Sequence, residues 1–292
     1  MTLLPTILHA EPKRHPLLIL QSSLAQSSLP ILRSLLVESS HRTILFCLLY
    51  PPSIFVDAAL SESVVVHDWL DRVPGYGDAE ETLTLTERIH DIVMQESSQS
   101  TTVIIDSVDT LLSDTGSVTE TYKCLSSLLV LIRKHPGTNL SCPFVVYNHP
   151  SDARLILHSQ SPSRLIPLIT TTAFSSSLTH LIAHPPSLLQ HLSTDLFVPP
   201  PPLSPDAKFW TVFIPISERT SDTERLVFGP GGEGSGHPSE IVVELIIREA
   251  SRRKRGVERI LEGWSNASSC ELRALETLKD SMNKQKAVRK AN

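Results

Sequence analysis

The sequence predicts an α/β fold with a mostly parallel sheet that antiparallel strands extend toward the C-terminal end. Apolar runs of strand length recur along the first half of the chain, and segments with the apolar spacing of a helix separate them. These runs are continuous, which is typical of strands that are covered on both faces. With 292 residues, of which 40% are hydrophobic, the chain can bury a sizeable core. Strands and helices that alternate in this way form right-handed βαβ units.

Residues 15–36 contain the strand, loop and helix in which a P-loop ATPase binds phosphate. An apolar strand runs into a short polar turn, and Ser28 is placed to cap the helix that follows. A P-loop needs glycines that aim backbone N–H groups at phosphate, a Lys for the β- and γ-phosphates, and a Ser or Thr for magnesium. From Gln21 to the end of this helix there is no Gly and no Lys. The frame of a nucleotide site is therefore predicted with degenerate Walker positions at Ser27 and Ser28.

Four further strands and two helices are predicted in the first half of the chain. Each helix begins at a capping box, one formed by Thr84 and Glu87 and the other by Ser117 and Glu120. The strands follow from apolar or β-branched runs. They are expected over 42–50, 63–69, 101–107 and 143–147.

Asp106 lies at the carboxyl end of the predicted strand over 101–107. An acidic residue at the carboxyl end of a buried strand is what a Walker B strand supplies to magnesium in P-loop enzymes. An Asp in this place can equally cap the turn that follows the strand. Both interpretations of Asp106 stand at this point.

The second half of the chain departs from the alternation of strands and helices. Its last three predicted strands, over 209–214, 225–228 and 240–247, are joined by turns too short for crossover helices, so they are expected to pair antiparallel. We predict one domain over 1–264 and a basic tail over 265–292 that is helical or partly disordered. The elements expected here are helices over 164–170 and 256–264, strands over 178–183, 209–214, 225–228 and 240–247, and an extended proline-rich segment over 198–205.

Several segments resemble parts of known metal or phosphate sites but lack residues that such sites need. His180, His184 and His191 are spaced like metal ligands, but prolines follow the second histidine and no Cys or Asp completes a zinc site. The glycine-rich segment 229–237 lacks a Lys and lies between two predicted strands, so we expect a flexible connection there. No motif of a hydrolase is present. We predict no catalytic residue, no metal and no cofactor.

The sequence also indicates the cellular compartment in which the chain is expected. No apolar run approaches the roughly 18 residues that a membrane helix needs, and the first residues lack the pattern of a secretory signal. The four cysteines are far apart and form no C-x-x-C pair, so we expect reduced, structural thiols. We therefore expect an intracellular chain with no contact to a membrane.

Charge is divided unevenly along the chain. Residues 248–292 contain 12 Lys and Arg against 6 Asp and Glu, and residues 1–247 contain 14 against 25. Such a basic segment can neutralise phosphates of RNA, or it can be a solvated surface turn and tail. The densest cluster, which supplies the candidates for an RNA contact, is Arg252, Arg253, Lys254 and Arg255.

Four segments share their order and spacing with one known family. They are Leu18–Arg33, Val66–Trp69, Val103–Leu112 and Arg255–Trp264. Together they resemble the fifth subunit of the Elongator complex, over most of the chain in element order. The Ala-Gln-Ser-Ser-Leu-Pro run and the Leu-Glu-Gly-Trp ending favour this family over sister subunits four and six, which share the fold.

The resemblance implies a non-catalytic, RecA-like subunit without Walker motifs. Such a subunit forms a six-membered ring with two copies each of subunits four and six, binds tRNA with them, and supports modification of wobble uridines at position 5 of the base. The chemistry belongs to another subunit, and the complex works in cytoplasm and nucleus. The basic C-terminal end departs from the family. Two alternatives remain, namely an active ATPase with a degenerate phosphate loop and a scaffold protein unrelated to tRNA.

Overall fold

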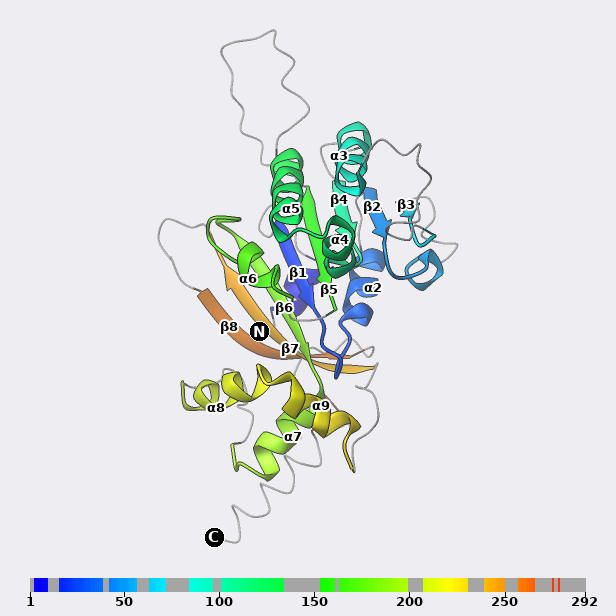
Figure 1. Ribbon diagram of the computed structural model, residues 1–292. Coiled ribbons are helices and arrows are strands. Elements are labelled where there is room, and N and C mark those ends of the chain that lie inside the picture. Colours follow the sequence, from blue (N-terminus) through cyan, green and yellow to red (C-terminus); the bar gives the residue numbers. More distant parts are fainter. Residues whose placement is uncertain are drawn as a thin grey trace, which may run out of the picture.

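Eight strands form one twisted sheet in the computed structural model (Figure 1). Their order is β3-β2-β4-β5-β1-β6-β7-β8. The first six strands are parallel, and β7 and β8 are added antiparallel at the β6 edge. The strands are β1 Leu17–Gln21, β2 Arg42–Cys47, β3 Val64–Asp68, β4 Thr101–Ile105, β5 Arg154–Ser159, β6 Leu178–His184, β7 Glu240–Arg248 and β8 Val257–Ser265. The predicted fold class, a mostly parallel sheet extended by C-terminal antiparallel strands, is confirmed.

The structure describes most of the chain, in eleven ranges. Within these residues no helix has the length and apolar character to cross a membrane. The ranges are 3–9, 16–38, 42–56, 63–71, 84–96, 101–133, 153–160, 163–198, 207–230, 239–249 and 257–265, together with Leu275 and Leu278.

Helices cover both faces of the parallel part of the sheet. Helices α3 to α6 pack on one face, where alternate residues of β1 such as Leu17 and Ile19 join their core cluster. Helices α1 and α2 pack on the other face against Leu18 and Leu20. The helices of these two layers are α1 Leu4–His9, α2 Leu29–Glu38, α3 Leu85–Glu96, α4 Val108–Thr115, α5 Val118–Arg133 and α6 Ile166–Ile169.

Three further helices lie at the end of the sheet where β6 ends (Figure 1). They are α7 Pro186–Thr194, α8 Ala207–Ser217 and α9 Thr220–Phe228. A third apolar cluster lies between α7, α8 and strands β7 and β8. Leu275 and Leu278, in the segment expected to be a separate tail, are buried in this cluster.

The two capping boxes that the sequence predicts are placed as expected, and one is reciprocal. The Thr84 backbone N–H donates to the Glu87 carboxylate at 2.8 Å, and the Glu87 N–H donates to Thr84 Oγ1 at 3.3 Å. At the second helix the Glu120 N–H donates to Ser117 Oγ at 3.3 Å. These local hydrogen bonds begin α3 and α5 where the sequence places them.

Three predicted elements of the second half are wrong. The segments 209–214 and 225–228 were expected as strands and lie in α8 and α9. A run of six apolar residues fits a strand or a buried helix equally well, and here Phe209 and Phe213, four residues apart, are buried together on one helical face. The predicted helix over 256–264 is strand β8, which pairs with β7 along nine residues.

One central strand was not predicted. β5 lies between β4 and β1 in the sheet, whereas the strand expected over 143–147 lies outside the described residues. The proline-rich segment after Val198 also lies outside them. The helix and strand expected over 164–170 and 178–183 are confirmed as α6 and β6.

Candidate functional site

The degenerate Walker A positions lie in the loop from β1 to α2, at the carboxyl end of the central strand. Ser28 directly precedes α2 and is fully buried, whereas Ser27 is exposed. In the pattern G-x-x-x-x-G-K-[ST], Ser28 stands at the magnesium-binding position and Ser27 at the Lys position. Ser27 and Ser28 thus lie between the central strand and the helix that follows it, in the strand–loop–helix unit that the sequence predicts.

The loop's own side chains occupy the donors that a phosphate would need. The Ser28 backbone N–H donates to Ser22 Oγ at 2.8 Å, and the two hydroxyl oxygens are 2.8 Å apart. The Gln26 N–H donates to Ser23 Oγ at 3.1 Å, and the Leu29 N–H donates to Ser27 Oγ at 3.2 Å. A P-loop leaves such N–H groups for phosphate oxygens, so this loop is already satisfied without a ligand.

Asp106 follows β4 and is fully buried. Its carboxylate accepts three backbone N–H groups from the segment after β2, from Leu48 at 2.7 Å, Leu49 at 3.0 Å and Tyr50 at 2.9 Å. Burial raises the pKa of this carboxyl, and the three N–H donors oppose that rise. The carboxylate therefore caps the segment after β2 rather than the turn that follows β4, where Ser107 Oγ accepts the Thr110 N–H.

His158 at the end of β5 joins the two Walker positions. Its Nδ1 is 2.6 Å from the Asp106 carbonyl oxygen, and its Nε2 is 3.0 Å from Ser22 Oγ. A carbonyl oxygen only accepts, so Nδ1 carries the hydrogen. Burial lowers the pKa of this imidazole, so the ring is neutral and Nε2 accepts the hydrogen of the Ser22 hydroxyl.

A continuous chain of hydrogen bonds results. The Ser22 hydroxyl hydrogen is used toward His158, so the short contact to Ser28 has the Ser28 hydroxyl as donor. The chain runs from Ser28 through Ser22 and His158 to the Asp106 carbonyl. We call Ser22, Ser28, Asp106 and His158 the closed loop site, because each polar group in it has a partner within the chain.

The other residues that the sequence singled out do not join this site. Arg252, Arg253, Lys254 and Arg255 lie outside the described residues. His180 and His184 lie on β6, and His191 lies on α7, where its Nδ1 is 2.6 Å from the Asp195 carboxylate. Among the described residues, no group of three or more potential ligands could hold a metal. The glycine-rich segment begins after helix α9 rather than after a strand, which corrects its expected context.

Sequence reasoning missed three polar residues that matter to the geometry. They are His158, Glu244 and Arg259. His158 was missed because β5 was expected elsewhere. Glu244 lies inside an apolar run with its charge buried, and that isolated acidic residue was the signal available in the sequence.

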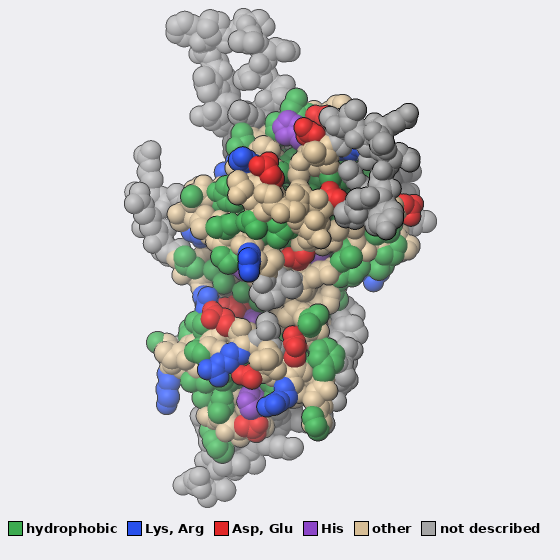
Figure 2. Space-filling model, in the orientation of Figure 1, with side chains coloured by type: hydrophobic (Ala, Val, Ile, Leu, Met, Phe, Trp, Pro, Cys, Tyr) green, Lys and Arg blue, Asp and Glu red, His purple; other side chains and the backbone are tan. Residues whose placement is uncertain are grey.

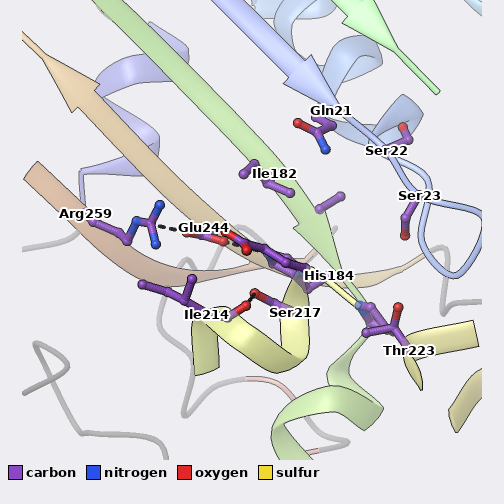
Figure 3. Close-up of a pocket in the computed structure, with 13 residues that line it drawn as sticks. Gln21, Ser22, Ser23, Ile182, His184, Ile214, Ser217, Thr223, Glu244 and Arg259 are labelled. Atoms are coloured by element: carbon purple, nitrogen blue, oxygen red, sulfur yellow. Dashed lines mark hydrogen bonds and ion pairs between the residues drawn. The ribbon is translucent and has the colours of Figure 1, made fainter. Parts of the chain in front are cut away.

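Beside the closed loop site lies a small cavity of about 150 Å³, at the carboxyl ends of β1 and β6 (Figure 3). Buried Glu244 lines this cavity. One of its carboxylate oxygens is 2.9 Å from His184 Nε2, and the other is 3.1 Å from Arg259 Nε. Burial alone would raise the pKa of Glu244, but the His184 hydrogen bond and the neighbouring charges outweigh it and lower that pKa.

Comparison with solved structures finds only distant likeness. A KaiC-like protein from the archaeon Pyrococcus horikoshii has 7% identity and a TM-score of 0.42, covering 85% of this chain and 86% of that one. The pCW3 conjugation coupling protein TcpA, in monomer form with ATPγS, has 10% identity and a TM-score of 0.40, covering 85% of this chain and 60% of TcpA. An uncharacterised Pyrococcus horikoshii protein in complex with an unknown peptide has 12% identity and a TM-score of 0.35, covering 84% and 92%.

No protein-family model and no curated protein matches the sequence. The TM-scores lie below 0.5, so the fold class rests on the sheet itself. The chain has a RecA-like α/β fold. The strand–loop–helix unit of β1 and α2 lies at the centre of its parallel sheet, Asp106 follows β4, and strand β5 lies between β1 and β4.

Proposed function

We propose that the chain is a non-catalytic RecA-like subunit that acts by assembly, as the fifth subunit of Elongator does in its six-membered ring with subunits four and six. The observation that carries this proposal is the closed loop site. Ser28 and Asp106 occupy the Walker positions, yet both are hydrogen-bonded within the chain. A nucleotide would have to displace these bonds without a Lys to replace them. The six-membered ring and the binding of tRNA are implied by the sequence resemblance to that subunit.

The two edges of the sheet support a role in assembly. β3 forms one edge with four of its five residues at least partly exposed, and β8 forms the other edge. Val257 at the start of β8 is 61% exposed. Unpaired strand edges with apolar side chains are surfaces that proteins cover by pairing with another chain or by a further segment. A ring subunit would cover them with its neighbours.

The test is the native mass of this chain co-expressed with candidate fourth and sixth Elongator subunits, with the chain expressed alone as the control. The proposal expects a six-membered species that contains two copies of each subunit. A soluble monomer that joins neither sister subunit would overturn it.

Contact with tRNA needs its own measurement, on the assembled species. Changing Arg252, Arg253, Lys254 and Arg255 to Ala is expected to weaken tRNA binding and to reduce its salt dependence, because fewer counterions are released. The matched control changes four other basic residues to Ala, namely Lys279, Lys284, Lys286 and Arg289. Equal loss in both variants would assign the effect to general charge rather than to the cluster.

A nucleotide assay tests the non-catalytic part. ATP with magnesium is expected to leave the melting temperature unchanged, since a ligand stabilises only a fold that binds it. Ser27→Lys restores the Lys of the motif but not its free N–H groups. ATP with magnesium is therefore expected to leave the melting temperature of this variant unchanged as well. A rise in melting temperature with ATP in the unaltered chain would favour the alternative of an active ATPase.

A further inference from the structure

A second, larger cavity is lined by residues of β6, β7 and β8 together with residues of α6 and the end of α8. Its volume is about 470 Å³, within the range of small-molecule sites. It adjoins the cavity of Figure 3, and four residues line both. These shared residues are Gln21, Ile182, Glu218 and Arg259.

The strand register sets the floor of this cavity. His180 of β6 pairs with Ile246 of β7, and Ile246 pairs with Arg259 of β8. The three residues therefore form one row on the same face, with a spacing of about 4.8 Å between neighbouring strands. His180 and Arg259 stand about 10 Å apart at the backbone, with an apolar side chain between them.

His180 offers a hydrogen-bond acceptor in this floor. The residue is 5% exposed, and its Nε2 lies 2.9 Å from Gln21 Oε1. Since an amide oxygen only accepts, Nε2 carries the hydrogen and Nδ1 holds a lone pair. Burial lowers the pKa of His180 to about 4, so the ring is neutral at pH 7. Within the described part of the chain Nδ1 has no hydrogen-bond partner, so an N–H group from a ligand would satisfy it.

Arg259 offers a fork of donors at the other end of the row. Glu244 holds its Nε at 3.1 Å (Figure 3), and the guanidinium lies 5.8 Å from the ring centroid of Trp210. These two contacts fix the orientation of the group. The two terminal nitrogens have no partner among the described residues. A guanidinium fixed in this way binds a carboxylate through two parallel hydrogen bonds.

The charges of the floor favour an anion. Arg248 lies beside this row and donates to three backbone carbonyl oxygens, those of Thr170, Thr171 and Ser175. These oxygens carry no full charge, and no described carboxylate pairs with Arg248. The cavity is thus lined by two guanidinium groups, those of Arg248 and Arg259, and the one buried carboxylate described beside them is that of Glu244, which pairs with Arg259. The exposed Glu218 lies at the rim of the cavity.

We propose that this cavity binds an N-acyl amino acid unit. The carboxylate would bind the Arg259 fork, the amide N–H would donate to His180 Nδ1, and an apolar side chain would lie against Ile182 and Ile246. The amide and carboxylate of such a unit are a few atoms apart, and the two residues that would bind them flank Ile246 in one row of the sheet. The unit can come from a free N-acyl amino acid or from the C-terminal residue of a peptide. The site holds whether or not the chain joins a ring.

The test uses N-acetyl-leucine as the probe and the full chain, with binding followed by calorimetry or ligand-observed NMR. Saturable binding in the low millimolar range is expected for a ligand of this size. N-acetyl-leucinamide, which lacks the carboxylate, and N-acetyl-N-methyl-leucine, which lacks the N–H, should each bind about tenfold more weakly. No saturable binding, or equal binding of acid and amide, would overturn the proposal.

Two variants test the residues. Arg259→Lys keeps the charge beside Glu244 but loses the fork, so N-acetyl-leucine should bind about tenfold more weakly. Arg42→Lys is the matched control, because Arg42 also pairs with a glutamate, Glu96, at 3.5 Å and lies on distant β2. Equal affinity in both variants would contradict the assigned site.

A peptide that ends in leucine separates the two sources of the unit. The same affinity as N-acetyl-leucine indicates that the unit alone is recognised. An affinity at least tenfold higher indicates a peptide C-terminus. Failure of the peptide and of N-acetyl-leucine together would contradict the site, and neither result bears on ring assembly.

Discussion

Two buried carboxylates, Asp106 and Glu244, are held in opposite ways. Asp106 accepts only backbone N–H groups, from three consecutive residues. Glu244 is held by two side chains, His184 and Arg259, beside a cavity. Backbone partners are fixed by the fold, whereas the two side chains that hold Glu244 also line a cavity. The closed loop site therefore uses its polar groups within the chain, and the region of Glu244 has polar groups beside a cavity.

Removal of the Asp106 carboxylate should have the largest effect on stability. Asp106→Ala leaves three N–H groups near a buried strand end without their acceptor, so we expect a loss of about 3–5 kcal/mol in the free energy of unfolding. Chemical denaturation measures it. Asp68→Ala is the matched control, because Asp68 also ends a strand but is exposed and accepts one N–H, from Leu70 at 3.1 Å. A loss in Asp106→Ala no larger than in the control would show that the carboxylate does not hold the segment after β2.

Glu244→Gln should have a smaller effect, since the amide keeps the shape and one acceptor but loses the charge beside Arg259. We expect a loss of about 2–3 kcal/mol in the free energy of unfolding. Glu258→Gln serves as control, because this residue lies on β8 and is exposed. An unchanged stability would mean that the ion pair only compensates its own desolvation, and the contrast between the two carboxylates would disappear.

The two carboxylates also differ in what the sequence could predict. The position of Asp106 could be predicted because it lies at the end of a short apolar strand. That signal is local in the sequence and does not depend on which other elements pack around it. The partners of Glu244 come from β6 and β8, and β8 was predicted as a helix. A strand added at the edge of a sheet is selected by its neighbour, here β7, so local spacing cannot identify it.

The same limit explains the rest of the fold. Capping boxes and continuous apolar runs are local signals, and they predicted α3, α5 and five of the six parallel strands. Helix α8 depends on packing of Phe209 and Phe213 against β7 and β8, which no local pattern reveals. Glu262 accepts the N–H groups of Leu3 and Leu4, more than 250 residues away, so β8 also anchors the first helix.

The pH dependence of stability should have opposite signs for the two carboxylates. The pKa of Glu244 is lowered from 4.5 in the fold, so its contribution is present above that pH and is lost as the pH falls through the folded pKa. The pKa of Asp106 is raised from 3.8, so folding disfavours its ionised form and stability is lost as the pH rises through the folded pKa.

Denaturation from pH 3 to pH 7 measures both signs. The stability of the unaltered chain minus that of Glu244→Gln should increase with pH over this range. The same difference for Asp106→Asn should decrease. Slopes of the same sign would show that burial does not separate the two groups, and that their different partners do not matter to their titration.

The smallest effect is expected at Ser22, which connects the two regions. Its hydroxyl accepts from the Ser28 N–H and donates to His158, and its side chain also lines the cavity beside Glu244. Ser22→Ala removes both bonds and should cost about 1–2 kcal/mol in the free energy of unfolding. Ser23→Ala, which removes one acceptor from the partly exposed Gln26 N–H bond at 3.1 Å, should cost less than half of that. If the two variants lose the same stability, the chain from Ser28 to Asp106 adds nothing beyond ordinary turn bonds, and the loop would be open to a ligand after all.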